Sequence, residues 1–369
     1  MSPIRFPSGF ALITIFIPIF IISCAARPVP ISPEKSTPSI LLVASQGGIV
    51  DGRGRFREIF RDVLSAASPK TQTGEPWDDA TKLWKLADEP PPTGKPAPSG
   101  PSRGTFRVVI VPGLLAECVA EKSTAFSDAR ERLEEIGYKT DYIQTRGRKG
   151  SSSNAELIRH AVTGMPTDEM VIFVTHSKGT VDTLEALVKY PSLAVRTAAL
   201  ISVSGAVNGS PLADAFPEFL LKLAHEIPIS SCSPGENIEA VNSLRRSTRI
   251  SWLSTHQLPR SVRYYSLAAF TLRQNTSRIL RPFYDILART EPINDSLVIC
   301  SDAIIPGSVL LGYPNADHLA VAMPFDRRIS QTLAWLIDEN DYPRAALLEA
   351  AVRFAEEDLA AAGTSPLSE

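Results

Sequence analysis

The chain has 369 residues, of which 44% are hydrophobic, and its formal net charge is −2 at pH 7. This length and apolar content are enough to bury one large core. A nearly neutral charge gives no compositional support for nucleic-acid binding, which requires a basic surface. Charge and composition do not determine an oligomeric state.

The N-terminus carries a pattern typical of export. Arg5 precedes an apolar run from Phe10 to Ile22, which is short for a membrane-spanning helix, and the run ends in Ile-Ile-Ser-Cys24. This ending resembles a bacterial lipoprotein signal, in which an aliphatic residue and two small or apolar residues precede a cysteine. The resemblance implies a signal peptide over residues 1–23, lipidation of Cys24, and a membrane-anchored protein of the bacterial cell envelope facing the periplasm or the cell surface. The alternatives are ordinary cleavage near Ala26 and an uncleaved short anchor.

A proline-rich tether is expected over residues 24–39, followed by a separate N-terminal segment over 40–103. Apolar residues at helical spacing, from Phe56 to Leu64, predict a helix in this segment, which ends in a proline-rich connector. Four arginines on that helix fit either a solvated face or a face toward anionic lipid heads. They are Arg53, Arg55, Arg57 and Arg61.

Residues 104–340 alternate between strand-like and helix-like patterns. Strands are predicted at 106–111, 138–143, 169–175, 197–203, 262–269 and 308–312, and helices at 124–136, 153–163, 178–190, 272–289 and 327–338. Such alternation predicts an α/β fold with a mostly parallel sheet and helices on both faces. Loops at the carboxyl ends of the strands then form the site. A C-terminal helix and tail are expected over 341–369.

The region 211–258 interrupts the alternation and is predicted to be a helical lid. It contains an apolar stripe from Phe216 to Leu223 and a second apolar stretch around Ile250, Trp252 and Leu253. An apolar cap suits an acyl or otherwise hydrophobic substrate. Plain core packing of the same residues is the alternative.

Ser177 lies where a buried strand turns into a helix, in Thr175-His-Ser-Lys-Gly179. A serine hydroxyl becomes a useful nucleophile when a tight elbow exposes it to a base, and the elbow requires small residues on both sides. Gly179 meets this requirement, whereas Thr175 stands where glycine is commoner. Ser45 and Ser233 also precede a glycine by two positions. Ser45 is excluded because Val43 is bulky and no helix follows, and Ser233 because no strand precedes it and Pro234 has no backbone N–H. A helix N-cap is the alternative role for Ser177.

Asp295 and His318 follow Ser177 in the chain, in the order nucleophile, acid, histidine that α/β-hydrolases use. We therefore predict that Ser177 attacks a carbonyl, His318 acts as base and then acid, and Asp295 orients the imidazole. Asp302 is an alternative acid. Asp317 is a weaker one, because adjacent side chains of an extended segment point in opposite directions.

An oxyanion hole is predicted from two backbone N–H groups. The buried strand from Arg107 ends in a glycine turn at Gly113. In hydrolases of this fold, the N–H after that turn and the N–H after the nucleophile stabilise the oxyanion. The N–H groups of Leu114 and Lys178 are assigned to bind the oxyanion.

With these motifs, residues 104–340 resemble the α/β-hydrolase superfamily, and four stretches are similar to bacterial true lipases. They are Thr-His-Ser-Lys-Gly at 175–179, Gly-Ser-Pro-Leu-Ala-Asp at 209–214, Val-Arg-Tyr-Tyr-Ser at 262–266 and Asn-Asp-Ser-Leu-Val at 294–298. The resemblance implies the α/β-hydrolase fold and a serine hydrolase that cleaves hydrophobic or acyl esters without a cofactor. The alternatives are an acyltransferase, thioesterase or amidase with the same triad, and a catalytically silent envelope-binding lipoprotein.

No metal is predicted. Those lipases hold a structural calcium partly through an acidic residue two positions beyond the histidine, where this chain has Ala320. Besides Cys24 the chain has Cys118, Cys232 and Cys300, which fit either one disulfide and one free thiol or three free thiols.

Overall fold

The computed structural model describes residues 48–67, 78–86, 88–102, 106–114, 123–215, 238–325 and 331–363. All of them belong to one compact unit that lies within Pro33–Glu369. The boundaries expected after residues 103 and 340 therefore run through this unit. The predicted signal peptide, Cys24 and the tether lie outside the described residues.

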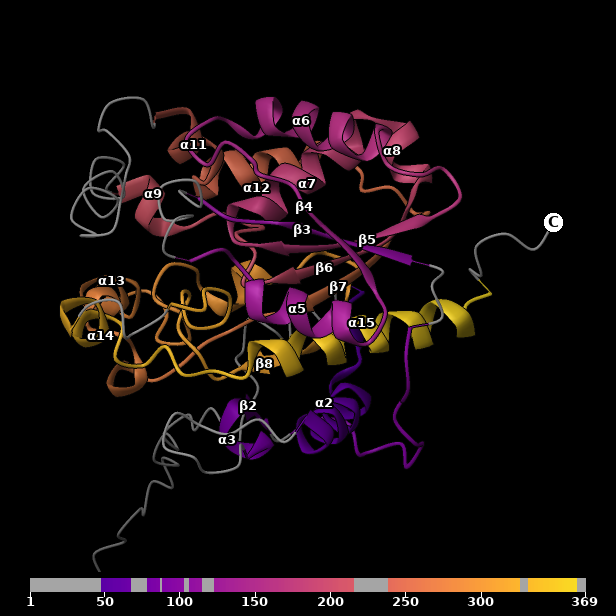
Figure 1. The fold of residues 1–369 in the computed structure, drawn as a ribbon. Coiled ribbons are helices and arrows are strands. Elements are labelled where there is room, and N and C mark those ends of the chain that lie inside the picture. The colour runs from indigo at the N-terminus through magenta and orange to yellow at the C-terminus, as the bar shows by residue number, and fades with distance from the viewer. Residues whose placement is uncertain are drawn as a thin grey trace, which may run out of the picture. The chain divides into compact units, whose positions relative to one another are not determined.

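The described residues build an eight-stranded sheet, which confirms the predicted mostly parallel arrangement (Figure 1). Seven strands follow the spatial order β1-β8-β7-β6-β5-β3-β4 with parallel neighbours, and β2 pairs with β8 antiparallel. The strands are β1 (Val50–Asp51), β2 (Leu83–Trp84), β3 (Phe106–Val111), β4 (Lys139–Tyr142), β5 (Met170–His176), β6 (Thr197–Val203), β7 (Arg263–Leu267) and β8 (Val309–Pro314).

Both faces of the sheet are buried. Successive side chains of a strand point to opposite sides, so an apolar strand contributes to the core on each face. In β3, Val108 and Ile110 join one hydrophobic cluster, while Val109 and Val111 join another. The first cluster is completed by α2 (Arg53–Ala67), α5 (Ser127–Glu135) and α15 (Arg344–Ala361). The second is completed by α6 (Ser151–Thr163), α7 (Lys178–Lys189) and α8 (Pro191–Val195), with α12 (Arg246–Thr255) on the same side (Figure 1).

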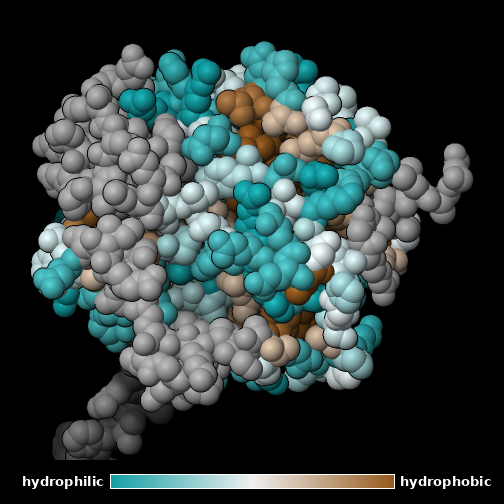
Figure 2. All heavy atoms as spheres, in the orientation of Figure 1, coloured by the Kyte–Doolittle hydropathy of each residue, from teal (hydrophilic) through white to brown (hydrophobic). Residues whose placement is uncertain are grey.

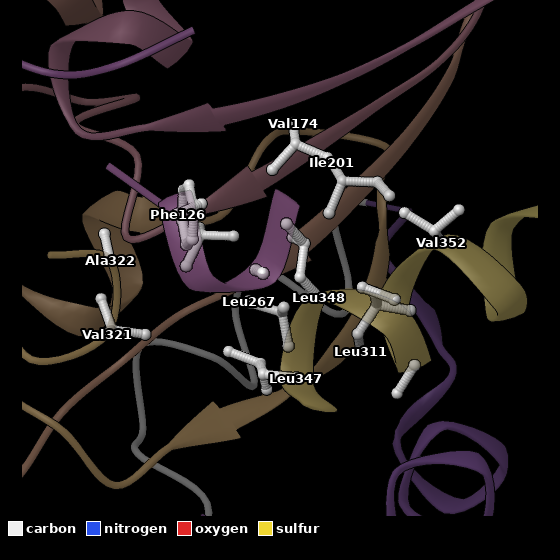
Figure 3. Packing of buried hydrophobic residues seen from close by; sticks show 14 of the residues in the cluster. Phe126, Val174, Ile201, Leu267, Leu311, Val321, Ala322, Leu347, Leu348 and Val352 are labelled. Carbon is white, nitrogen blue, oxygen red and sulfur yellow. The ribbon is translucent and has the colours of Figure 1, made fainter. Parts of the chain in front are cut away.

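The C-terminal helix α15 is a central part of the core. Leu347, Leu348 and Val352 of this helix are fully buried among side chains of the central strands, such as Ile201 (Figure 3). Because α15 covers the sheet directly, this helix is part of the same hydrophobic core as the sheet.

The helix predicted at 272–289 is broken into three pieces, so that prediction is wrong in its length. They are the 3₁₀ turns η1 (Arg273–Asn275) and η2 (Arg278–Leu280), and the helix α13 (Arg281–Leu287). Pro282 has no backbone N–H and therefore fits the first turn of α13 but not the middle of a longer helix. The last predicted helix, 327–338, is observed as α14 (Gln331–Leu336).

The segment before β3 joins the sheet. Its helix α2 packs against α15, and β1 and β2 on either side of α2 both pair with β8. A short helix, α3 (Asp79–Lys82), precedes β2. The described part of the N-terminal segment is thus continuous with the core of the sheet.

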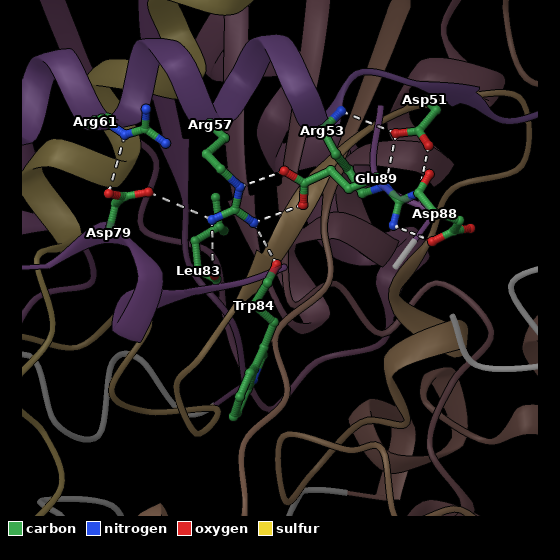
Figure 4. Close-up of polar contacts among 9 residues, drawn as sticks. All are labelled: Asp51, Arg53, Arg57, Arg61, Asp79, Leu83, Trp84, Asp88 and Glu89. Atoms are coloured by element: carbon green, nitrogen blue, oxygen red, sulfur yellow. Dashed lines mark hydrogen bonds and ion pairs between the residues drawn. The ribbon is translucent and has the colours of Figure 1, made fainter. Parts of the chain in front are cut away.

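Both sequence-based alternatives for the arginines of α2 are wrong for Arg53 and Arg57, which are only 3% and 6% exposed. Arg53 pairs with Asp51 and Asp88, and Arg57 pairs with Glu89 (Figure 4). These acidic partners lie on flanking segments, which a helical pattern cannot reveal.

The surface of the described residues is mostly hydrophilic on the side shown in Figure 2. Among the described residues, the large hydrophobic side chains that are exposed come from four different elements and are Val50, Val195, Ile250 and Trp335. Such scattered residues are ordinary on protein surfaces. Among the described residues, no helix is both long enough and apolar enough to cross a bilayer.

Candidate active site

Ser177 occupies a strained elbow between the end of β5 at His176 and the start of α7 at Lys178. Its backbone has φ 54° and ψ −124°, a region that non-glycine residues rarely adopt. The Ser177 carbonyl accepts hydrogen bonds from the N–H groups of Thr180 and Ala206, each at 3.2 Å. Its side chain makes no capping hydrogen bond, so the N-cap alternative is wrong.

Glycines allow the elbow to approach the neighbouring strand β3. A Cβ at Gly179 would lie 2.4 Å from the carbonyl oxygens of Val111 and Pro112. A Cβ at Gly113 would lie 2.7 Å from the Cβ of Ser177. Real Cβ atoms do not make contacts this close, so both positions require glycine.

Thr175, where glycine was expected, fits because its hydroxyl has partners. It is fully buried, and its Oγ1 lies 2.8 Å from Thr180 Oγ1 and 3.3 Å from the carbonyl oxygen of Ile201. These contacts offset the cost of burying a polar group. The imperfect elbow motif is therefore compatible with the fold.

Asp295 and His318 form a buried pair. His318 Nδ1 lies 2.7 Å from Asp295 Oδ2, and the two side chains are 3% and 1% exposed. The second carboxylate oxygen of Asp295 accepts the N–H groups of Leu297 at 3.0 Å and Val298 at 2.7 Å. The His318 N–H also donates to the Asp295 carbonyl at 2.8 Å. The acid is thus held rigidly, and its hydrogen bond to Nδ1 leaves Nε2 as the basic nitrogen of the ring.

Asp302, the alternative acid, binds Arg246 at the start of α12 and does not bind the histidine. Its carboxylate pairs with Arg246 at 2.8 Å and lies 3.4 Å from Asn208 Nδ2. Burial raises the pKa of Asp302, and the Arg246 guanidinium opposes this shift. Asp302 therefore anchors the first turn of α12.

Asp317 fixes the backbone of the loop that carries His318, residues 316–322, which we call the histidine loop. Its carboxylate accepts the N–H groups of Ser277 at 2.9 Å, Leu319 at 3.0 Å and Ala320 at 2.8 Å. Burial raises the pKa of Asp317, and these hydrogen bonds act in the opposite direction. The carboxylate faces backbone groups and makes no hydrogen bond to the His318 ring in the described part of the chain.

His176 is a site residue that the sequence analysis missed. The rings of His176 and His318 lie 4.6 Å apart, and His176 Nε2 lies 3.1 Å from the His318 carbonyl oxygen. Because a carbonyl only accepts, this nitrogen carries the proton. Complete burial lowers the pKa of His176 well below its usual range, and the charge of His318 adds to the effect. His176 is therefore neutral at neutral pH and fixes the backbone of the histidine loop.

The histidine loop is also held from two helices. The Phe126 N–H donates to the Ala322 carbonyl at 2.8 Å, and Phe126, Val321 and Ala322 pack together (Figure 3). Arg344 of α15 donates to the Ala320 carbonyl at 2.8 Å. A side-chain cation of the chain itself thus binds the loop near Ala320.

The structure brings the predicted residues to one edge of the sheet. Ser177 follows β5, His318 follows β8, and the packing of His176 against His318 joins the two strand ends. Within the described residues no hydrogen bond links Ser177 Oγ to His318. Such bonds are commonly long or absent before substrate binds.

The predicted oxyanion donors flank Ser177. Leu114 directly follows Gly113, and neither the Leu114 N–H nor the Lys178 N–H has an acceptor among the described residues. The Lys178 side chain is fully buried and pairs with Asp182 at 2.7 Å. Only the backbone of Lys178 is therefore available at the site.

The predicted lid begins beside the loop that carries Asp295, residues 294–299, which we call the acid loop. The Ser210 N–H donates to the Leu244 carbonyl at 2.8 Å, and Ser210 Oγ donates to the Leu297 carbonyl at 2.6 Å. The described parts of the insertion are α9 (Pro211–Ala215), α11 (Ile238–Ser243) and α12. Trp252 and Leu253 pack against the core, while the stripe from Phe216 to Leu223 lies outside the described residues.

The remaining predicted features have limited structural counterparts. Cys300 is a buried free thiol, while Cys118, Cys232, Ser45 and Ser233 lie outside the described residues. In the described ranges no group of three His, Cys, Asp or Glu side chains is placed to hold a metal ion.

The fold and the site geometry define an α/β-hydrolase, and comparison with solved structures identifies the family. The metagenomic carboxyl esterase MGS0156 shares 54% sequence identity, with a TM-score of 0.80 over 88% of this chain and 97% of that one. The chain therefore belongs to the same family of α/β-hydrolase esterases and is an ester hydrolase. The predictions of the fold and of an enzyme are confirmed.

Two lipases match more distantly. Mature BlEst2 from Bacillus licheniformis is 22% identical, with a TM-score of 0.45 over 61% of this chain and 89% of that chain. Lipase 1 from Pelosinus fermentans is 10% identical, with a TM-score of 0.46 over 72% and 100%. These values are too low to support an argument about this chain. No protein-family model and no curated protein matches it.

Gly179→Ala is expected to lower ester hydrolysis about tenfold or more, because the new methyl group meets two carbonyls and displaces the elbow. Gly164→Ala is the matched control, since a Cβ added at this position would have no neighbour closer than 3.5 Å. Hydrolysis rates of the two variants, measured beside their melting temperatures, test this. Wild-type activity of Gly179→Ala would contradict the steric account of the elbow.

Proposed function

We propose that the chain hydrolyses carboxylic esters through a triad of Ser177, His318 and Asp295. The observation that carries this proposal is the buried 2.7 Å contact of His318 with Asp295 beside the strained Ser177 elbow. One histidine nitrogen is thereby held by the acid, and the other is left as the basic nitrogen. The 54% identity with a carboxyl esterase supports the reaction class.

In the acylation step, Ser177 Oγ attacks the ester carbonyl carbon and its proton passes to His318 Nε2. The carbonyl oxygen becomes an oxyanion, which the N–H groups of Leu114 and Lys178 bind. The bond to the alcohol oxygen then breaks, and this oxygen takes the proton from His318. The products of this step are the free alcohol and an acyl ester on Ser177.

In the deacylation step, water attacks the acyl carbon while His318 Nε2 accepts its proton. The bond to Ser177 Oγ breaks, and Oγ regains the proton from His318. The carboxylic acid leaves and the enzyme is restored. Asp295 stabilises the imidazolium in both steps and stays ionised. No cofactor takes part in this scheme.

The substrate class that fits best is an ester with an apolar acyl or alcohol group. Leu114, Leu297 and Leu319 lie next to or near the site residues and are partly buried. All three pack against one apolar cluster, and Leu319 also packs against a second. An ester bound among them is surrounded by apolar surface. We infer that the insertion 211–258 caps this site, since its stems meet beside the acid loop.

We further propose that Cys24 carries a lipid anchor and holds the enzyme at a membrane of the bacterial envelope. The support is the sequence Ile-Ile-Ser-Cys at 21–24 after an apolar run. Several acyl chains at about 0.8 kcal/mol per buried methylene would keep a folded domain at the membrane.

Ser177→Ala is expected to abolish both ester hydrolysis and labelling by a fluorophosphonate probe, because no activated hydroxyl remains. The melting temperature should change little, since only one oxygen atom is removed. Gel fluorescence and mass spectrometry of the labelled protein measure this. Labelling that persists in the variant, for example at Ser233, would refute the assignment of the nucleophile.

Asp295→Asn is expected to lower kcat by about three to four orders of magnitude, because the amide no longer orients and stabilises the imidazole. Asp302→Asn serves as the matched control. It should retain most of its turnover, because Asp302 pairs with Arg246 and not with His318. The acid assignment fails if Asp302→Asn is inactive while Asp295→Asn turns over normally.

Cys24→Ser is expected to move the enzyme from the membrane fraction of cells to the soluble fraction, or to leave an unprocessed precursor, because the acyl acceptor is lost. Metabolic labelling with a clickable palmitate analogue measures lipidation directly. A mature-length wild-type protein without label would contradict the lipoprotein proposal.

A further inference from the structure

The N-terminal strand β2 pairs antiparallel with the end of β8, just before the histidine loop. Leu83 pairs with Pro314 and Trp84 with Tyr313. The pairing continues to Asn315, whose N–H donates to the Lys82 carbonyl at 2.9 Å. The N-terminal segment therefore contacts the chain only three residues before His318.

Asn315 connects this contact to the acid loop. Its Nδ2 donates to the Thr81 carbonyl at 2.8 Å, and its Oδ1 accepts the Thr271 hydroxyl at 2.7 Å. The Thr271 N–H in turn lies 3.3 Å from the carbonyl of Asn294, the residue before Asp295. A continuous chain of hydrogen bonds thus runs from the N-terminal segment through Asn315 and Thr271 to Asn294, the residue before Asp295.

Trp84 makes a second connection. Its indole Nε1 donates to the Phe270 carbonyl at 2.9 Å, and the two rings stack with centroids 5.4 Å apart. The Phe270 N–H donates to the Pro314 carbonyl at 3.1 Å. Trp84 therefore fixes the two segments that leave the carboxyl ends of β7 and β8.

Arg57 holds β2 in place from its outer side (Figure 4). A strand of two residues is weak by itself, and its outer carbonyls need partners. The Arg57 guanidinium donates to the Leu83 carbonyl at 2.9 Å and to the Trp84 carbonyl at 2.7 Å. It also pairs with Glu89 at 2.8 Å. The Arg57 side chain thus supplies the hydrogen-bond donors that a neighbouring strand would otherwise provide.

We propose that the N-terminal segment is a positioning element for Asp295 and His318, and that Arg57 and Trp84 are its positioning residues. This inference rests on the proposed triad. The segment binds neither substrate nor the reacting atoms. It acts by holding the ends of β7 and β8 so that the imidazole stays aligned with Ser177.

The consequence is an effect on turnover more than on substrate binding. A shift of the histidine loop by about 1 Å is enough to slow a reaction about a hundredfold, because the near-attack geometry is lost. The proposed oxyanion donors, the N–H groups of Leu114 and Lys178, are on other segments, after β3 and at the start of α7. A variant of Arg57 should therefore lower kcat while KM stays nearly constant.

The test compares Arg57→Gln with Arg55→Gln. Arg55 lies on the same helix and pairs with Glu357 of α15, but it does not touch β2. With p-nitrophenyl butyrate, Arg57→Gln is expected to lower kcat about 10- to 100-fold at nearly constant KM. Arg55→Gln should keep kcat within about twofold. Rates are measured well below the melting temperature of each variant.

Trp84 supplies a second pair of variants in case Arg57→Gln does not fold. Trp84→Phe keeps the stacked ring and loses only the N–H donor, so its kcat should fall less than that of Trp84→Ala. If Arg57→Gln and Arg55→Gln have equal kcat values, or if both Trp84 variants turn over like the wild type, the inference is overturned.

Fluorophosphonate labelling separates this inference from the proposed function. Wild-type labelling at Ser177 supports the triad, and its absence rejects the triad. A folded Arg57→Gln variant that is labelled at the wild-type rate rejects only the positioning role of the N-terminal segment.

Discussion

The close crossing of the elbow over β3 is the constraint on which the site depends. It holds Ser177 at a positive φ, and it is possible only because residues 113 and 179 lack a Cβ. The strain of such a conformation is of the order of 1–3 kcal/mol and persists only where surrounding structure enforces it. Here the enforcing structure is the parallel sheet, whose two apolar faces are both buried. Leu114 and Lys178, whose N–H groups are the proposed oxyanion donors, directly follow the two residues that meet at this crossing, Gly113 and Ser177.

The other half of the site depends on loops, which need support because they have no regular structure of their own. In the acid loop, the Asp295 carboxylate accepts hydrogen bonds from its own backbone. In the histidine loop, Asp317 does the same, and His176 and Arg344 bind the loop from two other segments. Hydrogen bonds to buried carbonyls and carboxylates are costly to leave unmade, so this network favours a single arrangement of the loop. The neutral state of His176 avoids a second positive charge beside the imidazole.

Much of this arrangement was predictable from local sequence. The elbow and the order of Ser177, Asp295 and His318 follow from strand patterns and spacing, and the structure pairs Asp295, not Asp302, with the histidine. The N-terminal strands were not predictable, since two residues show no periodicity and their partner strand is more than 200 residues away. The acidic partners of Arg53 and Arg57 were missed because they lie on the segments that flank α2, which a helical pattern does not reveal. His176 was overlooked because alternation says which way a side chain points but not what it meets there.

The most direct test of the account is a crystal structure of the protein after reaction with diethyl p-nitrophenyl phosphate, whose phosphoryl group resembles the tetrahedral intermediate. The account predicts a phosphorus atom bonded to Ser177 Oγ and a phosphoryl oxygen about 2.7–3.1 Å from the N–H groups of Leu114 and Lys178. His318 should then lie within hydrogen-bond distance of an ester oxygen. A phosphorus atom on any other residue, or a phosphoryl oxygen turned away from both N–H groups, would contradict the account.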